Sequence, residues 1–428
     1  MEPTLQKKEL RVSQMAENLI GSEIIKLAGE IREKINQGEN IYNFTIGDFN
    51  PKIFPIPSEY KKAILAAYEQ DETNYPEANG MLKLRQSVSR FLKERQGVQY
   101  SENEILISGG ARPIIYAVFQ TLVDQGDKVL FPVPSWNNNH YTFLSHANAI
   151  SIETRPENNF MPTAAEIKPH ISKINMLALC SPLNPTGTVF TEKDLGEICD
   201  LVLEENKRRG ENEKPLYVMF DQIYWVLTYG KTKHFDPVTL RPEMRDYTVF
   251  VDGVSKSLAA TGVRVGWAFG PARVIDKMKS ILSHIGAWAP KAEQLATAAY
   301  LDQSKAVDSF LDSFKKELLE RLDGFYAVFS KLKSEGYAVN AIAPQAAIYL
   351  TVQFDLTGMI TPAGKKLSST ADVTDYILSE AKMAVVPFSA FGSTDHSSWY
   401  RLSVGTAKIQ DIEIVYEKLK AALSKLSK

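Results

Sequence analysis

The chain has 428 residues, of which 44% are apolar and 23% charged, a composition typical of a globular protein. Lys and Arg total 49 against 51 Asp and Glu, so the net charge of −2 gives no electrostatic basis for binding nucleic acid. The N-terminus has no apolar signal core, and no stretch approaches the ~18 apolar residues of a membrane span. The two cysteines, Cys180 and Cys199, are expected to be reduced and buried. The composition therefore predicts a cytoplasmic protein without a metal site and without nucleic-acid or membrane partners.

Apolar residues at helical spacing predict a first helix over 22–34, which a strand over 41–46 and a loop rich in Gly and Pro follow. Strands and helices then alternate. Strands are expected over 104–107, 128–131, 150–154, 175–179, 216–220, 248–251 and 265–269, and helices over 114–122, 136–146 and 192–208. Several strands are continuous apolar runs, as strands buried on both faces should be. The alternation predicts an α/β fold with a mainly parallel sheet covered by helices on both faces.

The pattern changes near residue 304. A long helix is expected over 304–334, because its apolar residues recur at intervals of three and four, and a final helix over 410–426 has one apolar stripe. Strands and helices of a smaller unit lie between them. We therefore predict a large domain over residues 51–303 and a small α/β domain formed by residues 1–50 together with 304–428.

The segment VDGVSKSLAATGVRVGWAFGP, residues 251–271, places Lys256 among small residues, eight positions before Arg264. Small neighbours leave room for a planar group on the lysine nitrogen, and a lysine amine can form a Schiff base with a carbonyl compound. The Arg264 guanidinium offers a bidentate fork to a phosphate. Taken alone, Lys256 is equally explained as a solvated surface lysine.

The segment SKSLAATGVRVGW resembles the cofactor-lysine signature of class I and II aminotransferases, which are fold-type I enzymes dependent on pyridoxal 5′-phosphate. Further segments agree with that family in order and spacing along nearly the whole chain. The resemblance implies fold type I, pyridoxal 5′-phosphate as cofactor, and transfer of an amino group from an L-amino acid to a 2-oxo acid by a ping-pong mechanism. It makes Lys256 the catalytic lysine and implies that Ser255 and Arg264 bind the cofactor.

Two segments match the family around the cofactor ring. In SPLNPTG, residues 181–187, Asn184 matches an asparagine that contacts the ring hydroxyl and the substrate, although such a run is commonly only a turn. In LYVMFDQIY, residues 216–224, Asp221 ends a buried strand, where a carboxylate needs a cation such as a protonated pyridine nitrogen. The resemblance gives Asp221 that role and has Tyr224 bond the ring oxygen. An aspartate that caps the next turn is the alternative, and Gln222 replaces the family's usual glutamate.

Two further segments match residues around the cofactor. In ILISGGARPIIY, residues 105–116, two glycines precede a helix whose free N–H groups favour a phosphate. The resemblance implies that Gly110, Ala111 and Arg112 cradle the phosphate, and that Trp136 of PVPSWNNNHY stacks on the ring, unless it is a structural tryptophan. Nothing assigns a role to the asparagines at 137–139. Gly253 stands where many relatives have a phosphate-binding serine.

The remaining matches concern the substrate and the assembly. Arg401, in the apolar strand pattern of WYRLSVGT, occupies the position of the family's carboxylate-binding arginine, and a buried arginine needs a charged partner. Gly47, in TIGDFNP, matches a glycine whose backbone approaches that carboxylate. Tyr75, in NYPEANGMLKLR, matches a tyrosine that reaches the phosphate of the neighbouring subunit, which implies a homodimer with shared sites. A tyrosine that packs before a helix is the alternative.

Two alternatives of function stay open on the same motifs. The scaffold also hosts lyases that catalyse β-elimination at a C–S bond, whereas a regulator without turnover would need a DNA-binding domain that we do not expect here. The amino acid is undetermined. His284 weakly favours an acidic side chain but is more simply a packing residue, and Trp225, Trp288 and Tyr400 favour apolar or aromatic substrates equally well.

Overall fold

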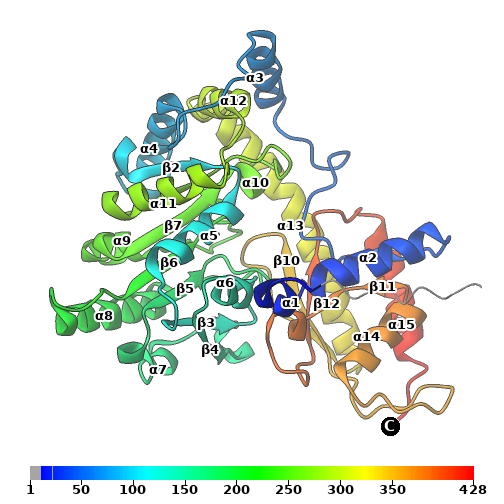
Figure 1. The fold of residues 1–428 in the computed structure, drawn as a ribbon. Helices are drawn as coiled ribbons and strands as arrows, with labels where there is room; N and C mark the ends of the chain where they lie inside the picture. Colours follow the sequence, from blue (N-terminus) through cyan, green and yellow to red (C-terminus); the bar gives the residue numbers. More distant parts are fainter. Residues whose placement is uncertain (1–10, 22) are drawn as a thin grey trace, which may run out of the picture.

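A computed structural model describes residues 11–21 and 23–428 (Figure 1). Its largest sheet has seven strands in the order β2-β8-β7-β6-β5-β3-β4. Only β8 runs antiparallel to its neighbours, which confirms the predicted mainly parallel sheet. The strands are β2 Ile105–Ser108, β3 Lys128–Val133, β4 Asn148–Glu153, β5 Met176–Cys180, β6 Tyr217–Asp221, β7 Thr248–Gly253 and β8 Gly266–Phe269.

Helices cover both faces of this sheet, as a mainly parallel sheet requires. Successive side chains of a strand point to opposite faces, so Met219 and Val251 pack on one face and Phe220 and Phe250 on the other. The first face is covered by α5 Ala111–Leu122 and α11 Ala272–His284. The second is covered by α4 Leu82–Gln96, α8 Glu192–Arg209 and α12 Lys291–Leu301, with α3 Ser58–Glu69 packed on α12.

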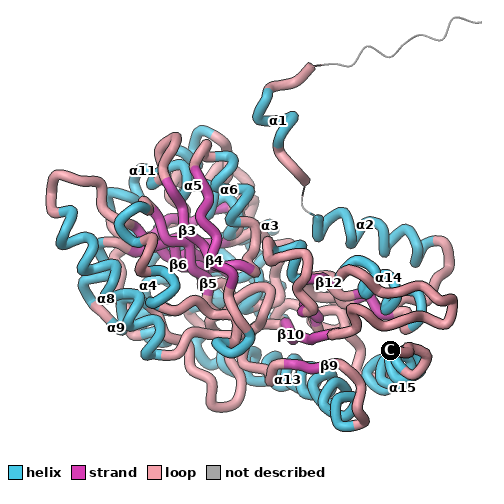
Figure 2. Tube along the Cα trace, turned by 90° about the horizontal axis from the view of Figure 1, so that it is seen from below, coloured by secondary structure: helices cyan, strands magenta, loops and turns pink. Residues whose placement is uncertain are grey.

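A second sheet of four antiparallel strands has the order β12-β13-β10-β9 and its own apolar core. Its strands are β9 Val339–Ala341, β10 Tyr349–Phe354, β12 Val386–Pro387 and β13 Trp399–Ser403. The two groups of strands lie apart in Figure 2. The long helix α13 Ser304–Ser334 contributes to both cores: Val307 and Leu311 pack with the large sheet, and Phe314 to Leu332 with the small one. The division into two domains at residue 303 stays a prediction.

The remaining elements are shorter or lie at the periphery. They are α1 Gln14–Asn18, α2 Glu23–Asn36, α6 Asn138–Leu144, α7 Ala164–Ile167, α9 Pro237–Leu240, α10 Val254–Ser257, α14 Thr370–Glu380, α15 Asp411–Leu423, and the pair β1 Tyr42–Asn43 with β11 Met383–Ala384. Helix α1 has no buried residue and stands away from the body in Figure 2. No helix among the described residues is both long and apolar enough to cross a membrane.

Some predicted boundaries are wrong for identifiable reasons. The helix expected over 136–146 begins only at Asn138, because Asn137 adopts a left-handed φ of 57°. The strand expected over 41–46 keeps only Tyr42 and Asn43 in a ladder, because the Thr45 carbonyl accepts a bond from a side chain, Arg401, instead. The first helix includes residues up to Asn36, and its expected start at Ser22 lies outside the described residues.

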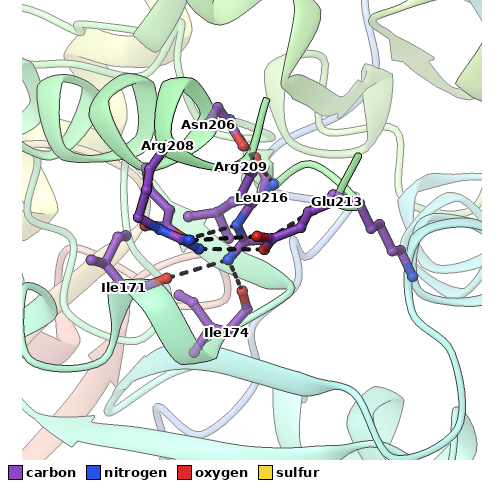
Figure 3. A network of polar contacts seen from close by, with 9 residues as sticks. Ile171, Ile174, Asn206, Arg208, Arg209, Glu213 and Leu216 are labelled. Atoms are coloured by element: carbon purple, nitrogen blue, oxygen red, sulfur yellow. Dashed lines mark hydrogen bonds and ion pairs between the residues drawn. The ribbon is translucent and has the colours of Figure 1, made fainter. Parts of the chain in front are cut away.

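A polar network fixes the start of β6, the strand that ends at Asp221 (Figure 3). The Asn206 side chain of α8 bonds both the N–H and the carbonyl of Leu216, at 2.7 and 3.0 Å. The buried Arg209 guanidinium pairs with Glu205 at 2.8 Å and donates to the Ile174 carbonyl at 2.7 Å. These bonds satisfy backbone groups that would otherwise be buried without partners, and they hold β5 and β6 against α8.

Candidate active site

A cavity of about 760 Å³ opens between the two sheets. The carboxyl ends of the parallel strands meet at its floor, where ligands bind in such folds. The predicted residues that line it are Gly47, Ala111, Arg112, Trp136, Asn184, Asp221, Tyr224, Ser255, Lys256, Arg264 and Arg401. Segments far apart in the sequence thus supply one site. Gly110 lies just behind the lining, and Tyr75 lies outside it.

Lys256 projects from the short helix α10 into this cavity. Its Nζ donates to the Gly47 carbonyl at 2.6 Å. Burial lowers the pKa of Lys256 to about 8; the Asp48 carboxylate opposes this shift, and the Arg401 guanidinium adds to it. Lowering the pKa makes the free amine far more populated near neutral pH than in an ordinary lysine, so Lys256 can act as a nucleophile or a base.

Arg401 is only 1% exposed and projects from the central strand β13 of the small sheet. Its Nη1 donates to Asn184 Oδ1 at 3.0 Å and its Nη2 to the Thr45 carbonyl at 2.6 Å, whereas Nε has no partner among the described residues. No carboxylate pairs with it in the part of the chain described here. A buried guanidinium without an acid partner is costly, and a ligand carboxylate would relieve that cost.

Gly47 leaves the space that Arg401 occupies. A Cβ atom at this position would lie 2.8 Å from Tyr349 Oη and 3.4 Å from Arg401 Nη1. Any larger residue would therefore push these side chains away from the cavity. The approach of the Gly47 backbone to a bound carboxylate stays a prediction; the packing places Gly47 beside the Arg401 guanidinium.

Asp221, the last residue of β6, and Tyr224 line the floor of the cavity. The Asp221 carboxylate accepts the Ile223 N–H at 3.1 Å. Burial raises the pKa of Asp221 to about 6, and that one hydrogen bond offsets only part of the rise. The Tyr224 hydroxyl shares a 2.6 Å hydrogen bond with Tyr349, a contact that no sequence pattern predicts. Asp221 therefore presents a carboxylate to the cavity without a cation paired to it among the described residues.

Glycines bring Arg264 and the start of α5 together. Gly110 is the N-cap of α5 with a φ of 97°, and a Cβ atom there would collide with the Arg264 guanidinium. The Arg264 side chain donates to the carbonyls of Thr261 and Gly109, each at 2.8 Å. A Cβ at Gly253 would lie 2.7 Å from the Gly266 Cα, so β8 leaves no room for the serine that many relatives have at position 253.

Trp136 and Arg112 lie together at the edge of the cavity. The Arg112 guanidinium carbon is 5.4 Å from the centre of the Trp136 ring, within the range of a cation–π contact. Ser255 lines the cavity at 8% exposure. Of the asparagine run, Asn138 is buried and lines the cavity, whereas Asn139 is exposed.

Tyr75 is not part of the cavity formed by its own chain. It is 82% exposed, and its ring centre lies 5.2 Å from that of Trp288. Tyr75 is thus not a core residue, but it does pack against Trp288, so both its role across a subunit boundary and its role as a packing tyrosine stay predictions.

The residues considered for substrate choice lie elsewhere. His284 is exposed at the end of α11, so its interpretation as a packing residue is wrong, and it does not line the cavity. Trp225 and Tyr400 are buried in the two cores. Cys199 is buried as predicted, but Cys180 is only half-buried and lines the cavity.

Sequence reasoning missed one wall of the cavity. Helix α2 contributes one face to it, formed by Ile24, Ile25, Ala28, Gly29 and Arg32. The helical spacing of this segment was visible, but nothing in it indicated that the helix lies over a site. Asp48, which accepts a 2.6 Å bond from Thr261, is a second omission.

Comparisons with known proteins agree with this architecture. The family model "Aminotransferase class I and II" matches residues 33–419. An aspartate aminotransferase of Bacillus sp. (strain YM-2) is 29% identical over 407 residues, which cover 94% of this chain and 96% of that protein. The solved aspartate aminotransferase of Rhizobium meliloti superposes with a TM-score of 0.87 at 24% identity, covering 98% of this chain and all of the other. An aromatic aminotransferase of Pyrococcus horikoshii OT3 gives 0.79 at 26% identity, with 92% and 98% covered. The family match spans most of the chain, and the chain therefore belongs to the class I and II aminotransferases, enzymes that transfer amino groups and depend on pyridoxal phosphate.

Proposed function

We propose that the cavity binds pyridoxal 5′-phosphate and moves an amino group from an L-amino acid to a 2-oxo acid in two alternating half-reactions. The observation that carries this proposal is the shared cavity of Lys256 and Arg401. Lys256 offers an amine of lowered pKa, and Arg401 offers a buried guanidinium without an acid partner among the described residues. An amino acid needs both groups, because its carboxylate must be anchored while the proton on its α-carbon is removed.

The residues present fit the cofactor. Asp221 would bond the protonated ring nitrogen, which supplies the cation that its carboxylate lacks. The N–H groups of Gly110, Ala111 and Arg112 begin a helix of 12 residues and would bind the phosphate beside Arg264. Trp136 would cover one face of the ring. Asn184 and Tyr224 would bond the ring oxygen, and Ser255 lies beside Lys256 on the phosphate side.

The chemistry divides between the cofactor and the chain. When bound, pyridoxal phosphate supplies a carbonyl carbon for the amino group and a ring that accepts electrons. Arg401 holds the substrate carboxylate, and Asn184 keeps the guanidinium oriented. Lys256 Nζ removes the proton from the substrate α-carbon and later returns it to the other carbon of the exchange. Asp221 keeps a proton on the ring nitrogen throughout.

We propose further that the substrate side chain is acidic. Arg32 of α2 and Arg112 of α5 both line the cavity and have no acid partner among the described residues. Arg264 would bind the phosphate and Arg401 the α-carboxylate. Arg32 and Arg112 therefore remain to bind a second carboxylate. The relatives named as aspartate aminotransferases support this assignment. An aromatic side chain, as in the Pyrococcus enzyme's name, would instead contact the apolar residues of α2.

A second copy of the chain completes this proposed site. The Tyr75 hydroxyl makes no hydrogen bond among the described residues, and Leu65, Tyr68, Leu82 and Ile285 are further large apolar residues that this chain leaves exposed. We propose a homodimer in which Tyr75 reaches the phosphate of the partner site. Two unpaired cysteines support a cytoplasmic location.

The test separates transfer from β-elimination, the alternative on this scaffold. Enzyme loaded with one equivalent of cofactor is mixed with aspartate and no 2-oxo acid. We expect one equivalent of 2-oxo acid per site and no ammonia, with turnover only after a second 2-oxo acid is added. Continuous release of ammonia and pyruvate from cysteine or cystathionine, at a higher kcat/KM than any amino-acid pair, would establish the lyase instead.

Specificity is tested with two variants and a control on the same helix. Arg32→Gln and Arg112→Gln should lower kcat/KM for aspartate by about tenfold or more while leaving that for phenylalanine within threefold, the loss expected for one charged hydrogen bond. Lys26→Gln is the matched control, because Lys26 is exposed on α2 and does not line the cavity. Equal losses for both substrates in the arginine variants would refute the acidic subsite.

A further inference from the structure

The segment that follows β6 presents alternate residues to two different environments. Asp221, Ile223 and Tyr224 line the cavity. Gln222 and Trp225 do not line it, and they are only 0% and 7% exposed. Trp225 packs in the apolar core on the face of the large sheet that α4, α8 and α12 cover. The side chains that would touch the cofactor are therefore held in place by neighbours whose own contacts lie behind the sheet.

Those contacts are hydrogen bonds to two separate elements. The Gln222 amide exchanges two bonds with the Gln96 amide at the end of α4, at 2.9 and 3.1 Å. The Trp225 indole N–H donates to Asp252 Oδ2 at 2.8 Å. The other Asp252 oxygen accepts the Gly253 N–H at 2.7 Å. Gly253 is the N-cap of α10, the helix that contains Lys256.

One buried carboxylate therefore links both halves of the catalytic machinery. Asp252 lies on β7, one residue beyond Val251, which is the ladder partner of Asp221 on β6. One oxygen accepts from Trp225, which directly follows the Asp221–Tyr224 segment, and the other from Gly253 in the turn that leads to Lys256. No other pair of hydrogen bonds among the described residues connects those two segments through a single side chain.

Packing does not explain a carboxyl at this position. Asp252 is 1% exposed, among aromatic residues that include Trp225 and Trp267, and no cation pairs with it in the described part of the chain. Burial raises the pKa of Asp252 to about 8, with the Gly253 and Trp225 N–H groups opposing the shift. An apolar residue would avoid this cost of burial, whereas only an acceptor with two oxygens can bond both N–H groups.

We propose that Asp252 is a positioning residue, whose carboxyl group joins the Trp225 indole to the Gly253 N–H and so fixes the Asp221–Tyr224 segment relative to Lys256. It does not touch the cavity, because it lies on the far face of the sheet. Its effect on catalysis rests on the proposed function, but the link itself is a property of the polypeptide. A displacement of about 1 Å between reacting groups lowers rates by roughly 100-fold, so this link has kinetic consequences.

The experiment replaces Trp225 with phenylalanine, which removes the indole N–H donor but keeps an aromatic ring in the core. Trp225→Phe should lower kcat between 10- and 100-fold, while KM for the amino acid changes less than threefold, because Arg401 lies on a different sheet. Tyr100→Phe is the matched control: Tyr100 is buried in the same core, but its hydroxyl has no hydrogen-bond partner among the described residues. It should keep kcat within threefold of the parent.

Hydrogen exchange in the cofactor-free protein gives a readout independent of activity. Amides of residues 222–225 should exchange at least tenfold faster in Trp225→Phe and in Asp252→Leu than in the parent, and Tyr100→Phe should leave them unchanged. Asp252→Asn retains an oxygen acceptor and should recover part of the protection. Unchanged exchange in Trp225→Phe, or equal losses of kcat in Trp225→Phe and Tyr100→Phe, would overturn the proposal. Faster exchange without aminotransferase activity in the parent would instead retain the link and refute the proposed function.

Discussion

The floor and the rim of the cavity differ in how firmly they are held. At the floor, Arg401 and Lys256 each donate to backbone or amide oxygens and are enclosed by the fold. At the rim, Arg112 contacts only an aromatic ring, Arg32 lies exposed on α2, and Tyr75 faces outward. One chain therefore brings the residues of the floor together by itself, whereas under the proposed function the rim would be completed by ligands and by a second copy. Changes at the floor should affect chemistry, and changes at the rim should affect binding and selectivity.

The sharpest test of the floor is Asp221→Ala. We expect kcat to fall at least 1000-fold, on the order of 4 kcal/mol, because a group that stabilises charge in the transition state is lost. Steady-state rates measure this loss, and thermal unfolding checks the fold. Asp276→Ala, an exposed aspartate on α11, is the control and should be silent. A kcat within tenfold of the parent would exclude Asp221 as the partner of the ring nitrogen.

Arg401→Lys should separate binding from chemistry at the same floor. The lysine cannot reproduce the guanidinium fork, so KM for the amino acid should rise about 100-fold, while kcat falls less. Arg321→Lys tests the effect of replacing another buried arginine, one that bonds the Ala407 carbonyl outside the cavity. If both variants raise KM equally, the carboxylate does not bind at Arg401.

Subunit mixing tests whether the rim needs a second copy. Tyr75→Ala and Lys256→Ala should each be weakly active or inactive alone. Random pairing of equal amounts should restore about a quarter of the sites, since half of the dimers are mixed and each mixed dimer has one intact site. Sedimentation must show a dimer in every sample. An active monomer, or no recovery on mixing, would contradict the shared site.

The smallest expected effect is a shift in the reactivity of Lys256. In the cofactor-free protein, amine labelling of Lys256 should reach half its maximum near pH 8, because burial lowers its pKa and the free amine is populated above that value. Lys365, whose pKa is raised by Asp372, should label only at higher pH. Arg401→Gln removes a neighbouring positive charge and should move the midpoint of Lys256 upward. Peptide mass spectrometry can follow both lysines in one sample.

The sequence predicts the residues of the floor better than the geometry around them. Asp221 and Lys256 follow apolar strands, and that pattern is enough to bring them to one edge of a parallel sheet. Tyr349 and Asp48 have no such signal, because their contacts join segments far apart in the chain. Gly253 stands where many relatives have a phosphate-binding serine. The close approach of Gly266 explains why a residue without a side chain stands there. Distances between strands cannot be inferred from a single residue.

The long helix α13 ties the stability of the two cores together. Its first turns pack against the large sheet and its later turns against the small one, with no break in the helix between them (Figure 1). Melting either core would expose part of this helix and weaken the other, so cooperativity extends across the whole molecule. The cavity between the sheets then persists as long as the chain is folded, and its loss should coincide with global unfolding.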